Sequence, residues 1–275
     1  MVLEKFSLDN KTGIITGGAG LLGRKHAEAV IEAGGIPVIA DIDKRLAEKT
    51  ASELSLKYKK EAIGIYMDIT SKQSVVSVRD EILKRFSKID FLINNAAIDP
   101  KVTKSPNVKS LSRFENFPED MWDKELDVGL KGSFICSQVF GIEMAKRREG
   151  VILNISSDLG IIAPDQRIYR KEGLLEDEQP VKPVTYSVIK HGLIGLTKYL
   201  ATYWGDKGVR VNALCPGGVY NNHPDDFVKK LTNLIPMGRM ADIDEYKAAV
   251  LFLISDASSY MTGAVLVIDG GKSVW

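Results

Sequence analysis

The stretch that decides the fold is "GIITGGAGLLG", residues 13–23. A short apolar run rich in β-branched residues leads into a glycine-rich turn, and a segment of helical character follows to about Ala33. Gly17, Gly20 and Gly23 allow a tight turn, let backbone amides approach a diphosphate, and aim the positive end of a helix at it. This arrangement is typical of dinucleotide binding, although glycine turns also occur in α/β proteins that bind no nucleotide.

An acidic residue at the end of the next apolar run strengthens this interpretation. Asp41 ends "IPVIAD" and follows Gly23 by 18 residues (41 − 23). A carboxylate there can accept hydrogen bonds from the ribose hydroxyls of NAD, and it repels the 2′-phosphate of NADP. The alternatives are that Asp41 caps a helix, or that Lys44 and Arg45 receive the phosphate of NADP. The sequence favours NAD.

Seven short apolar runs recur along the chain and predict the strands of one sheet. Their hydrophobicity is continuous rather than alternating, which suits strands covered on both faces in a parallel sheet. Segments with helical period separate them, for example residues 246–254. The runs are residues 13–16, 36–40, 62–66, 91–94, 151–155, 209–214 and 264–268. The alternation predicts a doubly wound α/β fold, with a parallel sheet and helices on both faces, as a single domain over residues 1–275.

Two irregular stretches interrupt this alternation, at about residues 98–118 and 158–183. Both are polar, contain proline, and follow directly after predicted strands. Ligands of doubly wound folds bind beyond the carboxyl ends of the strands, so we expect these loop insertions to carry function.

Composition excludes several classes of partner and site. Thirty-seven basic against 36 acidic residues give no electrostatic reason to expect nucleic acid or an anionic membrane as a partner. The N-terminus lacks the features of a signal peptide, and no apolar run approaches the ~20 residues of a spanning helix. Cys136 and Cys215 lie in apolar segments and predict buried thiols, hence a reduced, cytoplasmic compartment. The three histidines fit no zinc spacing, so no metal is expected.

The segment "VTYSVIKHG", residues 184–192, carries the catalytic signal. Tyr186 and Lys190 are four residues apart, so they share one face of a helix. A free tyrosine has a pKa of about 10, and a neighbouring ammonium stabilises the phenolate, which suits the phenol for general acid/base work near neutral pH. Taken alone, the pair also fits an ordinary helix surface, so the rest of the chain must decide.

The ordered set of motifs does decide. Besides the glycine turn and "YSVIK" (186–190), the chain carries "NNAA" (94–97), "NISS" (154–157), "PGG" (216–218) and "IDGG" (268–271). With these the sequence resembles the single-domain short-chain dehydrogenases/reductases (SDR family) over nearly its whole length. The resemblance implies a Rossmann-like sheet of about seven strands, nicotinamide-dependent interconversion of alcohols and ketones on a small-molecule substrate, and a homotetramer.

The resemblance also assigns roles to individual residues. Ser157 matches the serine that hydrogen-bonds the substrate oxygen, Tyr186 the acid/base, and Lys190 the residue that binds the nicotinamide ribose and lowers the pKa of the tyrosine. The implied cofactor-binding residues are Gly17, Gly20, Leu22, Gly23, Asp41, Asp68, Ile69, Asn95, Ala96, Lys190, Pro216, Gly217 and Val219. Structural alternatives are a helix cap for Asp68, a buried sheet anchor for Asn95 and a turn former for Ser157.

Three departures from the family pattern concern the site. Gly129 stands where the family usually has an asparagine that holds a water linking the lysine to solvent, which bears on the proton relay. The glycine turn has the spacing TGxxGxxG, more common in the extended, sugar-nucleotide branch of the superfamily. Ser157 and Tyr186 are 29 residues apart (186 − 157), about 15 more than in relatives, so the extra residues lie beside the substrate.

The longer loop supplies candidate substrate contacts. Arg167, Arg170 and Lys171 suit phosphates or carboxylates, and the ring of Tyr169 suits a sugar. The alternative is a solvated lid whose charges nearly cancel against the acids of residues 176–178. In detail this loop, with "PGGVYNN" and "PMGRMA", is similar to oxidoreductases associated with surface-polysaccharide or flagellin-glycan synthesis.

These observations predict an NAD-dependent oxidoreductase that interconverts a secondary alcohol and a ketone on a polar, sugar-like substrate. An NADPH-dependent ketoacyl-type reductase is the alternative enzyme, against which Asp41 argues. A non-catalytic nucleotide-binding regulatory or scaffold protein is the alternative from another class, motivated by Gly129 and opposed by the intact Ser157, Tyr186 and Lys190.

Overall fold

A seven-stranded parallel sheet forms the centre of the molecule. The computed structural model describes residues 1–98 and 111–275, so most of the predicted insertion at 98–118 lies outside the described residues. The sheet order is β3-β2-β1-β4-β5-β6-β7, and every neighbouring pair is parallel. The strands are β1 Thr12–Thr16, β2 Ile36–Asp41, β3 Ile63–Tyr66, β4 Phe91–Asn94, β5 Gly150–Ile155, β6 Val209–Pro216 and β7 Val265–Ile268. The order reverses direction between β1 and β4, the switch point where such folds bind ligands.

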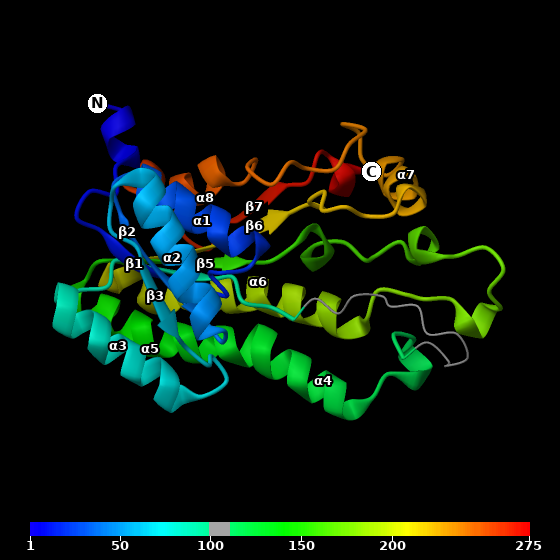
Figure 1. Cartoon of the computed structure of the whole chain (residues 1–275), viewed down its shortest axis with the longest axis horizontal. Helices are drawn as coiled ribbons and strands as arrows, with labels where there is room; N and C mark the ends of the chain where they lie inside the picture. The colour runs from blue at the N-terminus through cyan, green and yellow to red at the C-terminus, as the bar shows by residue number, and fades with distance from the viewer. Residues whose placement is uncertain (99–110) are drawn as a thin grey trace.

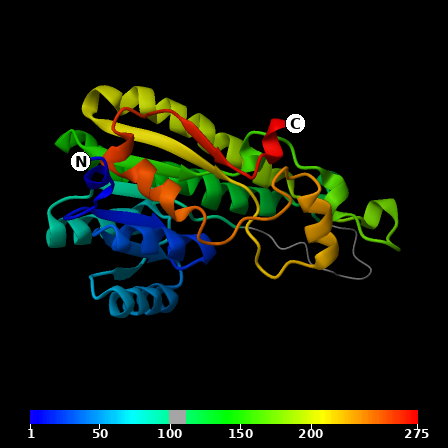
Figure 2. The ribbon, with the colours of Figure 1, turned by 90° about the horizontal axis from the view of Figure 1, so that it is seen from above.

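Helices cover both faces of this sheet (Figures 1 and 2). One apolar layer contains residues of α3, α5 and α6, and the other contains residues of α1, α2 and α8. The helices are α1 Leu21–Glu32, α2 Lys44–Tyr58, α3 Lys72–Phe86, α4 Glu119–Leu126, α5 Gly132–Arg147, α6 Val184–Trp204, α7 Asp225–Thr232 and α8 Lys247–Ile254. The chain therefore has the predicted doubly wound, Rossmann-like fold in a single domain.

Continuous hydrophobicity in the strands has a direct cause in this layering. Successive side chains of a strand point to opposite faces. In β1, Ile14 lies in the layer with α3 and α5, whereas Ile15 lies in the layer with α1 and α2, and both are fully buried. Since both faces of the central strands are covered, both positions must be apolar. All seven predicted strands are confirmed to within two residues at either end.

Residues 158–183 do not form an extended loop. They contain three short 3-10 turns, η4 Asp158–Gly160, η5 Gln166–Tyr169 and η6 Glu176–Glu178. Ile168 from this segment packs with Leu231 of α7 in a small apolar cluster separate from the two main layers. The Tyr169 ring lies 5.6 Å from that of Phe227. We call residues 158–183 together with α7 the loop–α7 unit; it lies at the carboxyl end of the sheet (Figure 1).

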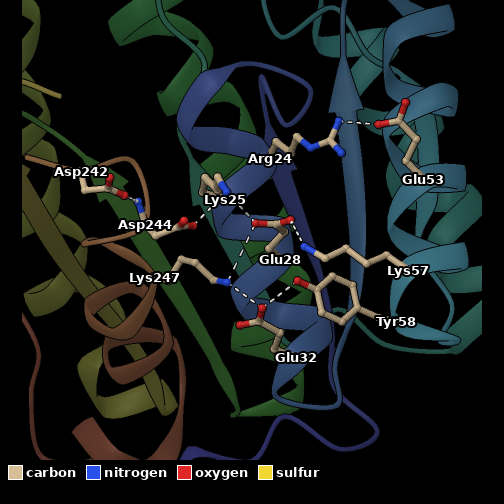
Figure 3. A network of polar contacts seen from close by, with 10 residues as sticks. All are labelled: Arg24, Lys25, Glu28, Glu32, Glu53, Lys57, Tyr58, Asp242, Asp244 and Lys247. Atoms are coloured by element: carbon tan, nitrogen blue, oxygen red, sulfur yellow. Dashed lines mark hydrogen bonds and ion pairs between the residues drawn. The ribbon is translucent and has the colours of Figure 1, made fainter. Parts of the chain in front are cut away.

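A network of charged side chains joins α1, α2 and α8, the helices of the second apolar layer (Figure 3). Glu28 of α1 is 4% exposed, and its carboxylate accepts hydrogen bonds of 3.0 Å from both Lys25 and Lys57. Lys247 at the start of α8 lies 3.9 Å from Glu28 and 2.6 Å from Glu32. The buried carboxylate thereby links α1, α2 and α8 around one point.

Candidate active site

The glycine turn is shaped by close approaches of the backbone. Gly17 has φ +58°, and a Cβ there would lie 2.8 Å from the Cα of Ala96. A Cβ on Gly23 would lie 2.2 Å from the carbonyl oxygen of Gly17. Helix α1 begins at Leu21 with Gly20 as its N-cap, and no side chain of the described residues hydrogen-bonds to this end. Its first amides remain available to an anionic group, as a diphosphate site requires.

Asn95 and Thr16 fix this turn to the sheet. The Asn95 side-chain amide donates to the carbonyl oxygens of Thr16 (3.0 Å) and Gly17 (3.1 Å). In return, the Thr16 hydroxyl oxygen accepts from the backbone amides of Asn95 and Ala96, each at 3.0 Å. Asn95 therefore holds the glycine turn against the end of β4. The sequence alone did not single out Thr16. The one feature that could have indicated its role is a hydroxyl directly before the glycines of the turn.

Asp41 lies at the edge of the same turn. Its carboxylate accepts hydrogen bonds from the amide of Ala19 (3.2 Å) and from that of Asp43 (3.1 Å). Helix α2 is capped by Asp43, whose side chain accepts from the amide of Leu46, so Asp41 is not the helix cap. The carboxylate stands at the carboxyl end of β2, next to β1, where a ribose bound over the turn would lie.

Asp68 and Ile69 follow β3 on the far side of this region. One oxygen of Asp68 accepts from the amide (2.9 Å) and the hydroxyl (2.7 Å) of Thr70, which closes the turn before α3. The N-cap of α3 is Ser71. Ile69 is 8% exposed and belongs to the apolar layer, so a cofactor would meet its backbone rather than its side chain.

Tyr186 and Lys190 lie in the first two turns of α6, which begins one residue after Pro183. The Lys190 ammonium lies 5.6 Å from the centroid of the Tyr186 ring, so the two do share one face. It donates a 2.9 Å hydrogen bond to the carbonyl of Ile155 at the end of β5. The Ser156 hydroxyl donates to the backbone carbonyl of Lys190 at 2.8 Å. These bonds hold the helix against the strand that ends beside Ser157.

Ser157 stands directly after β5 and is already engaged. Its hydroxyl donates a 2.7 Å hydrogen bond to Asp158 and accepts one of 3.2 Å from the amide of Leu159. Asp158 is 5% exposed and pairs with Lys272, near the C-terminus, at 2.7 Å. Sequence reasoning missed both Asp158 and Lys272. The available signal was a carboxylate inside the otherwise apolar segment that follows "NISS".

Most candidate substrate contacts of the long loop are engaged within the loop–α7 unit. Arg167 pairs with Asp165 and Arg170 with Glu176, while Tyr169 packs on α7. These pairings agree better with the alternative of a solvated lid, whose charges nearly cancel, than with cations that wait for a phosphate or carboxylate of the substrate. Lys182, which the sequence did not single out, instead reaches the catalytic helix, with its ammonium 3.8 Å from the centroid of the Tyr186 ring.

Gly129 lies in a π-helical turn, Asp127–Lys131, between α4 and α5. Its carbonyl accepts a 3.0 Å hydrogen bond from the Ser133 hydroxyl. A Cβ on Gly129 would lie only 2.7 Å from Cγ2 of Ile189, the neighbour of Lys190. The space that an asparagine side chain would need is thus occupied by Ile189.

The segment after β6 carries the residues predicted to meet the nicotinamide. Pro216 ends the strand, and the amide of Gly217 donates to the carbonyl of Ile268 at 2.8 Å. Tyr246 donates to the carbonyl of Gly217 at 3.1 Å. Val219 forms a bridge with Ala241. The loop predicted to meet the nicotinamide is therefore tied to both β7 and the start of α8.

Beneath the site, buried amides of β4 and β5 connect α5 with α6 on one face of the sheet. Asn94 donates to Ser137 of α5 (3.0 Å) and to Asn154 (2.8 Å), and Asn154 donates to Thr197 of α6 (2.8 Å). The sequence supplied both asparagines as parts of motifs but gave them no role. Across residues 1–98 and 111–275, no cluster of three or more His, Cys, Asp or Glu side chains could hold a metal ion. No helix in those ranges is long and apolar enough to cross a membrane.

Comparison with known proteins agrees with this geometry. The short chain dehydrogenase family model matches residues 11–169, and a model described as enoyl-(acyl carrier protein) reductase matches residues 177–273. The chain belongs to the short-chain dehydrogenase/reductase family and is an NAD(P)-dependent oxidoreductase that acts on CH–OH groups.

Individual relatives cover nearly the whole chain. An NAD-dependent glycerol dehydrogenase of Listeria innocua is 31% identical, over 98% of this chain and 97% of its own length. Post-translational flagellin modification protein A of Campylobacter coli is 30% identical, over 96% and 98% of the two chains. A gluconate 5-dehydrogenase of Burkholderia cenocepacia, solved in complex with NADP and tartrate, is 27% identical with a TM-score of 0.85, over 100% of both chains.

Proposed function

We propose that this protein is an NAD-dependent dehydrogenase that interconverts a secondary alcohol and a ketone on a polyol or a sugar-like molecule. The observation that carries the proposal is that α6, which bears Tyr186 and Lys190 on one face, is hydrogen-bonded to Ile155 and Ser156, directly before Ser157. The similarity to a glycerol dehydrogenase and to a gluconate 5-dehydrogenase supports a polar, hydroxylated substrate.

The residues of the glycine turn fit a dinucleotide. Gly17 and Gly23 let the backbone of the turn pack closely where a Cβ would clash, and no side chain caps the N-terminus of α1 that follows. In the proposal Gly20 and Leu22 complete the diphosphate site, Asp41 binds the ribose, and Asp68, Ile69, Asn95 and Ala96 border the adenosine half. Lys190, Pro216, Gly217 and Val219 hold the nicotinamide half. When bound, the nicotinamide supplies the acceptor or donor of the hydride.

The chain's own groups then handle the proton and the oxygen. Tyr186 takes the proton of the substrate hydroxyl during oxidation and returns it during reduction. Lys190, on the same face of α6, adds positive charge beside the phenol and stabilises its ionised form. Ser157 holds the substrate oxygen by a hydrogen bond, so the charge that develops there is met by a fixed group.

Two observations favour competing proposals. The match of residues 177–273 to the enoyl-(acyl carrier protein) reductase model favours a reductase of acyl substrates, and the alternative of that kind is the NADPH-dependent ketoacyl-type reductase. Gly129 in its π-helical turn supports a nucleotide-binding protein without turnover, because the usual asparagine is missing. Asp41 argues against the first alternative, and the presence of Ser157, Tyr186 and Lys190 argues against the second.

We also propose a cytoplasmic homotetramer. Cys136 and Cys215 are both free and buried, as suits a reducing compartment. Tyr199 and Tyr203 of α6 stack with ring centroids 5.7 Å apart and border a surface cavity of about 640 Å³ between α5 and α6. With the apolar stretch that ends at Trp275, this surface could bury area between copies. Light scattering that reports a particle of 30.3 kDa at micromolar concentration would contradict this part of the proposal.

The test of the function is a screen of polyols, sugar alcohols and keto sugars with NAD and NADP, followed by the absorbance of the reduced nicotinamide. We expect turnover of a hydroxylated substrate, with NADH bound more tightly than NADPH. Asp41→Ala should narrow that difference in affinity. Tyr186→Phe should lower turnover by ~10²- to 10⁴-fold while leaving NADH binding intact. Wild-type speed in Tyr186→Phe would refute the mechanism.

A further inference from the structure

A buried ion pair joins the C-terminal segment to the residue beside Ser157. The Lys272 ammonium lies 2.7 Å from one oxygen of Asp158, and the two side chains are only 10% and 6% exposed. Charges removed from water this far are costly unless further hydrogen bonds satisfy them. The other oxygen of Asp158 accepts from the Leu159 amide (2.8 Å) and from the Ser157 hydroxyl (2.7 Å).

The C-terminal segment is folded so that Lys272 points to this place. Asp269 follows β7, and its two oxygens accept from the amides of Gly271 and Ser273, each at 2.9 Å. Beyond it, the indole N–H of Trp275 donates to the carbonyl of Leu234 at 3.2 Å. The backbone is therefore fixed on both sides of Lys272, and its ammonium is held against the end of β5.

The consequence for Ser157 follows from its hydrogen-bonding capacity. A hydroxyl has one hydrogen to donate and two lone pairs that accept. The hydrogen of Ser157 is committed to a carboxylate, which is a stronger acceptor than a neutral group. In the proposed reaction the single hydrogen of an alcohol goes to Tyr186, so Ser157 must be the donor to the substrate oxygen. In this state Ser157 has no hydrogen left for that oxygen. To donate to the substrate oxygen, the Ser157 hydroxyl must turn away from Asp158.

We propose that Asp158 and Lys272 are positioning residues for Ser157. Asp158 holds the Ser157 hydrogen while no substrate is bound, and Lys272 weakens the pull of the carboxylate so that the hydroxyl can turn and donate to the substrate oxygen. The inference rests on the proposed function for its chemistry, because Ser157 needs its hydrogen released only if it binds the substrate oxygen.

Other ionisable groups interact with Asp158 or Lys272, but they do not take the place of Lys272 as the cation beside Asp158. Burial raises the pKa of Tyr246, and the charge of Asp158 adds to the effect. The pKa of Asp165 is held low mainly by its hydrogen bond from Arg167, with a smaller contribution from Lys272. Among the described residues, Lys272 is the cation paired directly with Asp158.

The first arm of the test needs no substrate. In a Ser157→Cys background, the rate of alkylation by a small thiol reagent is measured against pH; Cys136 and Cys215 are both fully buried, and the protein without the substitution gives the background. We expect Lys272→Met to raise the pH midpoint by about one unit and Asp158→Asn to lower it by about one unit. Their combination, which leaves no unpaired buried charge, should nearly restore it. Unchanged midpoints in both single variants would overturn the inference.

The second arm uses a polyol that the wild type oxidises. Lys272→Met should lower kcat/KM about tenfold with the affinity for NADH unchanged, and Lys272→Arg should recover most of the loss. In a Ser157→Ala background Lys272→Met should have no further effect, whereas a purely structural role would lower the rate by the same factor again. Ser273→Ala, which alters the next residue and leaves the backbone bond from Ser273 to Asp269 in place, is the matched control. If the wild type oxidises no polyol, the proposed function fails, while the thiol measurement still decides this inference.

Discussion

The Lys182 ammonium lies over the ring of Tyr186, 3.8 Å from its centroid, closer than the 5.6 Å of Lys190. The two cations come from different parts of the chain, one from the end of the long loop and the other from α6 itself. A cation over an aromatic face contributes about 0.5–2 kcal/mol, depending on how far water is excluded. The loop therefore takes part in the electrostatics of the proposed acid/base as well as in enclosing the site.

The first prediction concerns this contact. Lys182→Met should move the midpoint of the pH–rate profile for alcohol oxidation to higher pH, because a positive charge that favours the phenolate is lost. Lys182→Arg should retain most of the wild-type profile, since the guanidinium keeps the charge. Steady-state rates over a pH series check this expectation. Identical profiles for the wild type and Lys182→Met would show that Lys182 does not act on Tyr186.

Gly129 gives a prediction about packing. Gly129→Asn should destabilise the fold by about 1–3 kcal/mol, because its Cβ would meet the β-branched side chain of Ile189. Combining it with Ile189→Ala should cost less than the sum of the two single substitutions, since the clash disappears. Denaturant unfolding of the four proteins measures this, and strict additivity would count against the clash. The structure leaves the asparagine that is usual at this position no room without this second change.

His26 gives a prediction about acid stability. Burial lowers its pKa to about 4 from an ordinary 6.5, with a smaller opposing effect of Asn95. As the pH falls, His26 takes up a proton in the unfolded chain at a higher pH than in the folded protein. The stability that neutral His26 contributes is therefore fully present above pH 6.5 and is lost as the pH falls toward 4. The loss amounts to about 3 kcal/mol. His26→Leu should therefore lose less stability than the wild type over this range in denaturant titrations; parallel curves would contradict the prediction.

Glu28 makes a second contribution to the free energy of unfolding that depends on pH. Burial by itself would raise the pKa of Glu28, but the hydrogen bonds from Lys57 and Lys25 outweigh it and hold the pKa below 4.5. The stabilisation is present above that value and is lost as the pH falls below it. Glu28→Gln should cost about 1–3 kcal/mol at pH 7 and much less in acid. Glu53→Gln, which removes an exposed partner of Arg24 in the same layer, is a control that should change little.

The strands and the shared helix face of Tyr186 and Lys190 could be predicted because their signals are local, whereas the catalytic roles rest on the resemblance carried by motifs along the whole chain. A strand buried on both faces, as in Ile14 and Ile15, must be apolar throughout, and the spacing of Tyr186 and Lys190 fixes their shared face. Each of these signals can be recognised within a few neighbouring positions of the chain.

Contacts between distant segments gave no such signal. Asp158 and Lys272 are 114 positions apart, and nothing in either segment indicates the other. Lys182 was overlooked in favour of Arg167 and Arg170, because sequence shows which charges are present but not which of them pair with each other. The structure resolves this by engaging both arginines with acids of the loop itself.

The loop–α7 unit has an evolutionary consequence. Its part formed by η5 and α7 encloses a small core around Ile168 and Leu231, and Lys230 of α7 donates to the carbonyl of Arg170 at 2.6 Å, so these two segments hold each other. Substitutions in η5 and α7 can reshape this part of the surface without loosening the sheet or the glycine turn. Within one ancestral scaffold, selectivity can therefore diverge between descendants by exchange of η5 and α7, while Asp158, Lys182 and the machinery for hydride and proton transfer are inherited unchanged.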